Sequence, residues 1–140
     1  MTGPAMDFKL EVVQVPVSDV DRAKAFYAEN AGFNLDRDHQ VSDDVRVVQL
    51  TPPGSGCAIV VGTGLSDMEP GSVQGLQLVV ADIDAARTAL VERGVDVSEI
   101  QVLGRPGRPG FRFASFRDPD GNGWILQEER PFEPGPGSRH

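Results

Sequence analysis

The sequence is poor in the residues that build disulfides and metal centres. Cys57 is the single cysteine among 140 residues, so no disulfide can form within the chain and no cysteine-based zinc site is possible. Histidine occurs only twice. His39 stands in a predicted polar hairpin and His140 is the last residue, and because metal ligands come in clusters we interpret both as solvated.

Basic residues and long apolar runs are also scarce. The chain has 13 basic residues against 21 acidic ones, a net charge of −8. Nucleic acids and anionic membranes both attract a basic face, so this balance argues against either partner. No apolar run approaches the roughly 18 residues of a membrane span, and residues 1–9 are too polar for a signal peptide. We therefore expect a cytoplasmic protein.

What the chain does have is one pattern twice. Pro-Val-Ser-Asp-Val-Asp at residues 16–21 recurs as Val-Val-Ala-Asp-Ile-Asp at 79–84. Thr-Pro-Pro-Gly-Ser-Gly at 51–56 recurs as Asp-Pro-Asp-Gly-Asn-Gly at 118–123, in the same order and at nearly the same offset. Self-similarity at about half the chain length predicts one domain built from two like modules.

Local patterns predict the same order of elements in both modules. In the first module, Asp19 is the predicted N-cap of a helix over 20–30, which Gly32 ends. In the second, Asp82 is the predicted N-cap of a helix that runs to about Arg93, and Gly94 ends it. Short runs rich in β-branched and aromatic residues predict the strands, at 9–17, 33–38, 46–50 and 57–61, then at 76–80, 95–103, 111–116 and 124–127.

The resulting fold class is α+β, with two tandem βαβββ modules forming a curved mixed sheet around a cavity. We expect a single domain over residues 1–130, with modules at about 8–62 and 74–128 joined by a linker at 62–71, and a disordered tail at 131–140. The Gly-Pro-rich segment 104–110 is expected to be a surface loop, with a lid over a pocket as the alternative.

With both modules placed, the chain resembles the vicinal oxygen chelate superfamily, which contains glyoxalases, bleomycin resistance proteins and extradiol dioxygenases. The resemblance spans about residues 10–128 and is carried by the segments 16–19, 22–27, 32–33 and 118–124. We interpret the Asp-Pro-Asp-Gly turn at 118–121 as a structural hairpin, because its residues are those that tight turns require. Asp118 and Asp120 are therefore read neither as catalytic nor as metal ligands.

The resemblance implies four metal-ligand positions, on the first and last strand of each module, which enzymes of the family fill with His, Glu or Gln. They fall here on Val12, Ala58, Gly75 and Ile125, and no side chain among them can bind a metal. We therefore predict no metal and no cofactor. A slip of one or two residues would bring other side chains to these positions, namely Glu11, Gln14, Gln77, Gln127 or Glu128, but the repeat aligns without a gap.

The resemblance further implies a concave site, and side chains two residues from the ligand positions should share its face. This gives Gln14 and Gln77, which are equivalent in the repeat, and Gln127. The two equivalent glutamines either clamp a ligand's carbonyl or hydroxyl, or bond each other or water. The candidate ligand-binding residues are Gln14, Gln77, Gln127 and Phe113, while Trp124 and Cys57 are expected in the core.

The leading hypothesis for function is a metal-independent protein that sequesters or shields a hydrophobic or aromatic compound, as drug-binding resistance proteins of the family do. The first alternative is a metal-free isomerase or cyclase in which Gln14, Gln77 or Glu11 positions the substrate. The second is a metal-dependent lyase or dioxygenase. No catalytic residue is identified. A symmetric homodimer is expected, because exposed strand edges favour pairing, with an internally paired monomer as the competing outcome.

Overall fold

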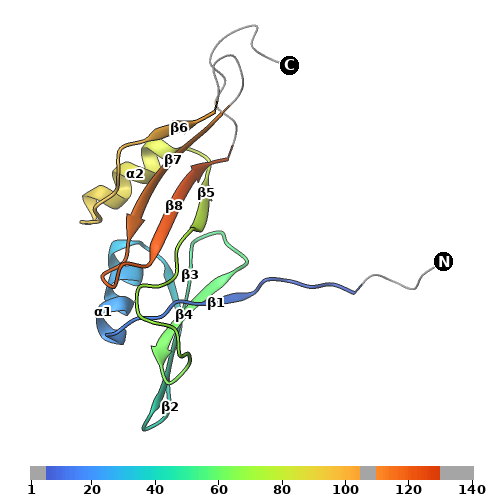
Figure 1. Ribbon diagram of the computed structural model, residues 1–140, viewed down its shortest axis with the longest axis vertical. Coiled ribbons are helices and arrows are strands. Elements are labelled where there is room, and N and C mark those ends of the chain that lie inside the picture. Colours follow the sequence, from blue (N-terminus) through green and yellow to red (C-terminus); the bar gives the residue numbers. More distant parts are fainter. Residues whose placement is uncertain (1–5, 105–109, 130–140) are drawn as a thin grey trace, which may run out of the picture.

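The computed structural model describes residues 6–104 and 110–129 and contains two four-stranded mixed sheets (Figure 1). Their strand orders are β1-β4-β3-β2 and β5-β8-β7-β6, so each sheet is one module of the repeat. The predicted βαβββ order and the α+β class are confirmed. Most of the segment 104–110 and all of the tail 131–140 lie outside the described residues. None of the described helices is long and apolar enough to span a membrane.

The first module begins with a short edge strand and a capped helix. The Asp19 side chain accepts a hydrogen bond from the Arg22 backbone N–H at 3.0 Å, as predicted for an N-cap. The helical segment ends at Asn30, and Gly32, two residues later, has a φ of 81° that favours glycine. The elements are β1 (Val12–Gln14), α1 (Val20–Ala25), the π-helical turn η1 (Phe26–Asn30), β2 (Asn34–Ser42), β3 (Val45–Thr51) and β4 (Ala58–Thr63).

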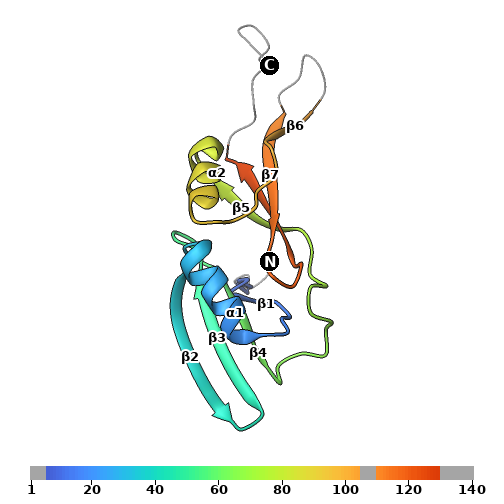
Figure 2. The ribbon, with the colours of Figure 1, turned by 90° about the vertical axis from the view of Figure 1, so that its left-hand side faces the viewer.

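The second module repeats this order, and the linker between β4 and β5 runs along one side of the molecule (Figure 2). Asp82 caps its helix by accepting from the Ala85 N–H at 3.1 Å. In both modules the first strand runs parallel to the last. The elements are β5 (Leu76–Val80), α2 (Ile83–Glu92), β6 (Gln101–Leu103), β7 (Phe111–Arg117) and β8 (Gly123–Glu128).

Two predicted strands are much shorter than expected. The strand predicted over 9–17 is paired only as β1, and the one over 95–103 only as β6. Val97 is buried there, and the carbonyls of Val97 and Ser98 accept hydrogen bonds from the Arg87 guanidinium at 3.1 and 2.6 Å. Two backbone carbonyls before β6 are therefore satisfied by a helix side chain, while the Ser98 N–H donates to the Ser115 carbonyl of β7 at 2.8 Å.

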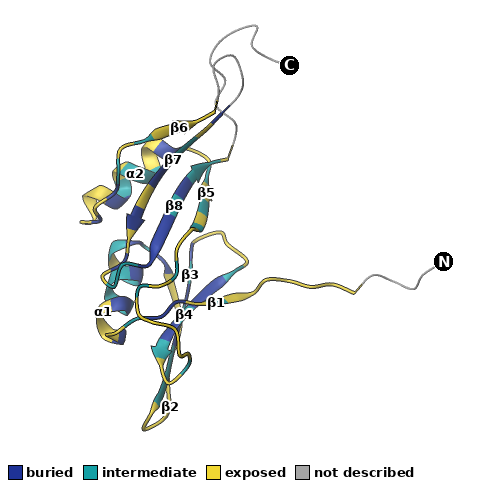
Figure 3. Ribbon diagram, in the orientation of Figure 1, coloured by how far each residue is buried: buried dark blue, intermediate teal, exposed yellow. Residues whose placement is uncertain are grey.

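A single core joins the two modules, and the buried segments of both meet where the sheets approach each other (Figure 3). Trp124 is at its centre: its ring centroid lies 5.7 Å from that of Tyr27, 5.5 Å from Phe33 and 6.1 Å from Phe116. Such aromatic packing dominates core energetics. Trp124 is thus a core residue as predicted, whereas Cys57 is only half-buried and lies outside this core.

Candidate functional site

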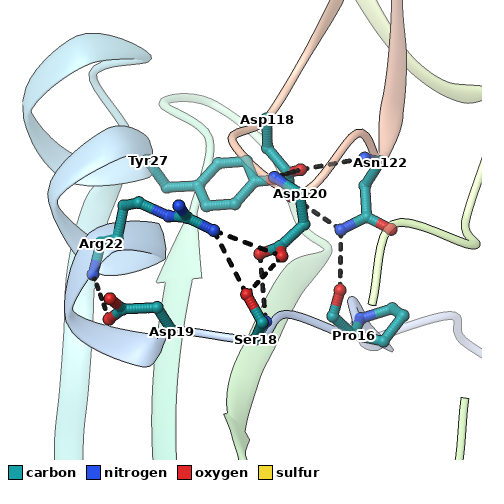
Figure 4. A network of polar contacts seen from close by, with 8 residues as sticks. All are labelled: Pro16, Ser18, Asp19, Arg22, Tyr27, Asp118, Asp120 and Asn122. Atoms are coloured by element: carbon teal, nitrogen blue, oxygen red, sulfur yellow. Dashed lines mark hydrogen bonds and ion pairs between the residues drawn. The ribbon is translucent and has the colours of Figure 1, made fainter. Parts of the chain in front are cut away.

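The turn at residues 118–123 reaches out of the second module and bonds to the first (Figure 4). The Tyr27 hydroxyl donates to Asp118 Oδ2 at 2.7 Å and accepts from Trp124 Nε1 at 2.9 Å. Asn122 is fully buried, and its Nδ2 donates to Asp118 Oδ2 and to the Pro16 carbonyl, both at 2.8 Å. Burial, and then the nearby Asp118 carboxylate, raise the pKa of Tyr27 far above its ordinary value, so this hydroxyl remains a neutral donor.

Asp120 extends the contact to the start of α1. Its carboxylate accepts from the Ser18 hydroxyl at 2.6 Å, the Ser18 N–H at 3.1 Å and Arg22 Nη2 at 3.4 Å. The turn is therefore structural, as predicted, but it also connects segments that lie far apart in the sequence. This second role was not predicted from the sequence. The available signal was that the turn carries carboxylates, while Ser, Arg and Tyr side chains that can donate hydrogen bonds to them follow closely on one another near the first N-cap.

Three of the four predicted ligand-binding residues lie together on the face of the second sheet that α2 does not cover. Phe113 is paired with Gln127, and Gln127 with Val79, while Gln77 lies opposite Ile125. The Gln77 Nε2 donates to Gln127 Oε1 at 3.2 Å. By strand alternation Phe111 shares this helix-free face, whereas Phe116 points into the core.

The fourth predicted residue, Gln14, lies apart from the other three. It is exposed on β1, opposite Val60, and borders a hollow of about 40 Å³ whose walls include Gly62 and Leu65. Gln77 borders a different and much larger cavity. Within one chain the two glutamines neither bond each other nor share a cavity, although both lie on helix-free faces as expected.

The positions that hold metal in related enzymes do not fit a metal here. In the first module, Val12 lies opposite Ala58, as the repeat alignment requires. In the second module, Gly75 precedes β5, and Ile125 lies opposite Gln77 instead of Gly75. The alignment of the repeat without a gap is therefore wrong by two residues in the last strand. The structural equivalent of Ile125 is Val60 and not Ala58. None of these side chains is a metal donor. Over residues 6–104 and 110–129, no group of three or more His, Cys, Asp or Glu side chains could hold a metal ion.

Of the side chains that a slip would have supplied, Glu128 is directed to the other face of its sheet and is already paired. Glu128 lies on the α2 side, where its carboxylate accepts from Arg112 Nε at 2.9 Å and from Arg112 Nη2 at 2.8 Å. These bonds lower the pKa of Glu128 below its ordinary value. His39 is exposed on β2, opposite Val47, and His140 lies outside the described residues.

A cavity of about 530 Å³ lies between the modules, beside the free edge of β5 and under α2. Its walls are mostly apolar, and Gln77, Ser55 and Arg93 add polar groups. The other principal lining residues are Pro52, Pro53, Leu78, Val79, Val80, Ala86, Ala89 and Leu90. Sequence reasoning did not predict this cavity.

The repeat explains why the cavity exists. The alignment of residues 16–21 with 79–84 continues along the helices, so Ala89 stands where the first module has Phe26, and Leu90 where it has Tyr27. Phe26 and Tyr27 pack against aromatic side chains in the core. Their smaller equivalents leave the matching space beside α2 unfilled.

Comparison with known proteins agrees with this architecture. Residues 9–126 match the family model of the Glyoxalase/Bleomycin resistance protein/Dioxygenase superfamily. The chain belongs to this superfamily. The predicted resemblance is therefore confirmed.

Several solved structures are similar to this chain over nearly their whole length. TnmS3, an antibiotic-binding protein from Streptomyces sp. CB03234, is 37% identical, with 89% of this chain and 98% of that one covered and a TM-score of 0.75. A glyoxalase/bleomycin resistance protein from the same organism is 39% identical, with 84% and 98% covered and a TM-score of 0.69. A superfamily member from Sphaerobacter thermophilus DSM 20745 is 33% identical, with 89% and 100% covered and a TM-score of 0.74.

Proposed function

We propose that this protein binds and sequesters a hydrophobic or aromatic small molecule without using a metal. The main support is the helix-free face of the second sheet, where Gln127 lies opposite Phe113 and bonds Gln77, and where Phe111 follows along the same strand as Phe113. A flat apolar ligand would cover the aromatic side chains, as in other ligand pockets. The similarity to the antibiotic-binding protein TnmS3 favours the same class of ligand.

The glutamine pair supplies both kinds of hydrogen-bonding group for such a ligand. Gln77 Nε2 and Gln127 Oε1 bond each other, while among the described residues no partner bonds Gln77 Oε1 or Gln127 Nε2. One acceptor and one donor are therefore available for a hydroxyl and a carbonyl of the ligand. We infer that Gln77, Gln127 and Phe113 contact it.

We also propose a symmetric homodimer, which would close the site. Each chain leaves apolar side chains exposed on both helix-free faces, including Val12 on β1 and Val79 on β5. A twofold axis that places the first module of one copy against the second module of another covers both faces at once. Gln14 of one copy would then face Gln77 of the other. We expect the protein to act in the cytoplasm.

Thermal shift against a panel of aromatic antibiotics, with aliphatic compounds of equal size as controls, tests the proposal. A ligand that binds the native state raises Tm, and we expect only aromatic compounds to do so. Replacing Gln77 with Leu should weaken binding about tenfold, the loss of roughly one hydrogen bond.

Gln40→Leu is the matched control, since its amide bonds the carbonyls of Ser42 and Val45 in the distant β2–β3 hairpin. Equal losses in both variants would contradict the assigned site. If no compound raises Tm, sequestration is wrong. If a compound binds and is converted, the metal-free isomerase or cyclase becomes the better description.

A further inference from the structure

The cavity of about 530 Å³ beside β5 has no part in the function proposed above. Its volume falls within the roughly 300–1,000 Å³ of small-molecule pockets. Both modules supply its walls: Pro52 and Pro53 come from the earlier turn, and Ala86, Ala89 and Leu90 come from α2. Walls of this kind offer water few hydrogen-bond partners, so an apolar compound that enters the cavity gains free energy by leaving water.

Arg93 gives this cavity its charge. It is the single charged residue among those that line the cavity, in a chain with a net charge of −8. It takes part in none of the ion pairs between described residues. A guanidinium at the rim of an apolar space, with no carboxylate among the lining residues, favours an anionic ligand.

Contacts with the first module hold Arg93 at the cavity. The Arg93 carbonyl accepts from Asn30 Nδ2 at 2.6 Å. The guanidinium lies against the backbone of Gly32, where a Cβ would come within 2.9 Å of Arg93 Nη1. Asn30 and Arg93 are equivalent in the repeat, so the two helix ends meet here and only one of them carries a charge. Because Arg93 is already held in place, it loses less conformational freedom when it binds an anion.

The open edge of β5 adds backbone donors at the same place. The Val80 carbonyl accepts from the Glu129 N–H at 2.7 Å, on the side of β8. Successive residues of a strand direct their N–H and C=O groups to opposite sides, so those of Gln77 and Val79 point away from β8. Both residues line the cavity, and among the described strands β5 pairs only with β8. A ligand oxygen can therefore accept from a backbone N–H as well as from Arg93.

We propose that this cavity is a second ligand site, which binds an apolar carboxylate. The hydrocarbon body of the ligand fills the space under α2, and its carboxylate pairs with Arg93 at the rim. An amine would meet a guanidinium and no carboxylate there, so cationic compounds are disfavoured. The site differs from the helix-free face in its walls and in the charge of the ligand that it takes, and it therefore goes beyond the function proposed above.

Isothermal titration calorimetry of the full chain with cinnamate tests the charge. Cinnamamide is the matched compound, because it keeps the shape and loses the charge. We expect cinnamate to bind more tightly than cinnamamide by about fivefold or more, and Arg93→Met to remove this preference. Arg37→Met is the control, since it removes the same charge from the exposed strand β2, outside the cavity lining, and should keep the preference. No binding of cinnamate at millimolar concentration, or a preference that survives Arg93→Met, would overturn the proposal.

Filling the cavity tests the location of the site. Ala89→Phe restores the side chain of the equivalent Phe26, and we expect it to weaken cinnamate binding by about tenfold or more. Ala86→Leu, one turn earlier on α2, adds a smaller volume to the same wall and should weaken binding in the same direction. Urea unfolding shows that each variant is folded, and Ala86→Leu decides if Ala89→Phe is not. Unchanged affinity in the folded variants would overturn the proposal.

Failure of this site is distinguishable from failure of the proposed function, because the two probes differ. Arg93→Met and Ala89→Phe should leave the Tm shift of a bound aromatic antibiotic unchanged, since neither residue lies on the helix-free face. If they abolish that shift and cinnamate does not bind, the cavity belongs to the antibiotic site and the proposal is wrong. If cinnamate does not bind and Ala89→Phe separates the proposed dimer, a second copy covers the cavity, which also overturns the proposal.

Discussion

The turns at residues 118–123 and 51–56 occupy equivalent places in the two modules, yet they make different contacts with the rest of the chain. The later turn buries Asp118 and Asn122 and bonds to Pro16, Ser18 and Tyr27 of the first module. The earlier turn leaves residues 53–55 exposed and borders the cavity beside β5. One copy of the repeat therefore joins the modules, whereas the other leaves a space between them.

The helices have diverged together with the turns. Ser18, Arg22 and Tyr27 bond to the carboxylates of the later turn. Their equivalents in the second module are Ala81, Ala85 and Leu90, which have no polar side-chain atoms, and the earlier turn has no carboxylate to receive one. Because donors and acceptors are absent together, no buried polar group is left unpaired on that side of the described structure.

The contacts within each module have been kept in both copies. The Arg46 guanidinium joins β3 to the start of α1 through Asp21 at 2.9 Å, and Arg112 joins β7 to the start of α2 through Asp84 at 3.1 Å. Asp21 and Asp84 are equivalent in the repeat. This connection of helix to sheet is thus duplicated, whereas the contacts of the two turns are not.

The largest expected effect comes from removing the carboxylate that joins the modules. Asp118 is buried and accepts hydrogen bonds from Tyr27, Asn122 and the Asp120 N–H. Asp118→Ala should lower the free energy of unfolding by about 3 kcal/mol or more, because buried donors lose their partner. The equivalent Thr51→Ala should cost less than about 1 kcal/mol, because Thr51 is half-buried at the end of β3 and its hydroxyl bonds only the exposed Asp36. Urea unfolding measures both, and similar values would refute the asymmetry.

A smaller effect is expected from the tyrosine hydroxyl alone. Tyr27→Phe keeps the ring contact with Trp124 but leaves the indole N–H and Asp118 each without one partner. We expect a loss of about 2 kcal/mol in unfolding free energy. The equivalent Leu90→Met, which conserves volume, should cost less than about 1.5 kcal/mol. If Tyr27→Phe costs nothing, the hydroxyl does not hold the modules together.

The sequence was sufficient for the parts of the fold that local chemistry determines. β5 was predicted with its observed ends, and both Asp19 and Asp82 are the N-caps. The register of the last strands was not predictable, because the two turns differ by two residues in where pairing resumes. The cavity was also missed: it depends on Ala89 and Leu90 facing the turn at 51–56 in the other module, a contact that no local pattern encodes.

Lowering the pH should weaken another ion pair of each arginine by a similar amount, that of Arg46 with Asp38 in the first module and that of Arg112 with Glu128 in the second. Hydrogen bonds from Arg46 and then Lys24 hold the pKa of Asp38 well below its ordinary value, and Arg112 lowers the pKa of Glu128. Groups with a lowered folded pKa stabilise the fold above their unfolded values, near about 3.9 and 4.3, and lose this effect as the pH falls.

Because both carboxylates are partly exposed, each should contribute less than about 1 kcal/mol between pH 5 and pH 3. We expect Arg46→Met and Arg112→Met to flatten the acid side of the stability curve by similar amounts in urea titrations. A pH dependence unchanged in one variant only would show that the two contacts are not equivalent.

The smallest expected effect is that of metal ions, for which the two modules should behave alike. The first module offers Val12 and Ala58 at the positions that the resemblance implies. The second offers Gly75 and Ile125 or, in the observed register, Gln77 and Ile125, and no imidazole or carboxylate is present in any of these pairs. Of the glutamines near these positions, Gln77 and Gln127 bond each other, and Gln14 lies on β1 in the other sheet. We therefore expect a chelator to leave Tm unchanged, and added Ni²⁺, Zn²⁺ or Fe²⁺ not to raise it, since a ligand stabilises only a fold that it binds. Elemental analysis after mild purification should find far less than one transition-metal ion per chain. One ion per chain, together with a drop in Tm on chelation, would instead place a metal site in a protein whose described donors do not form one.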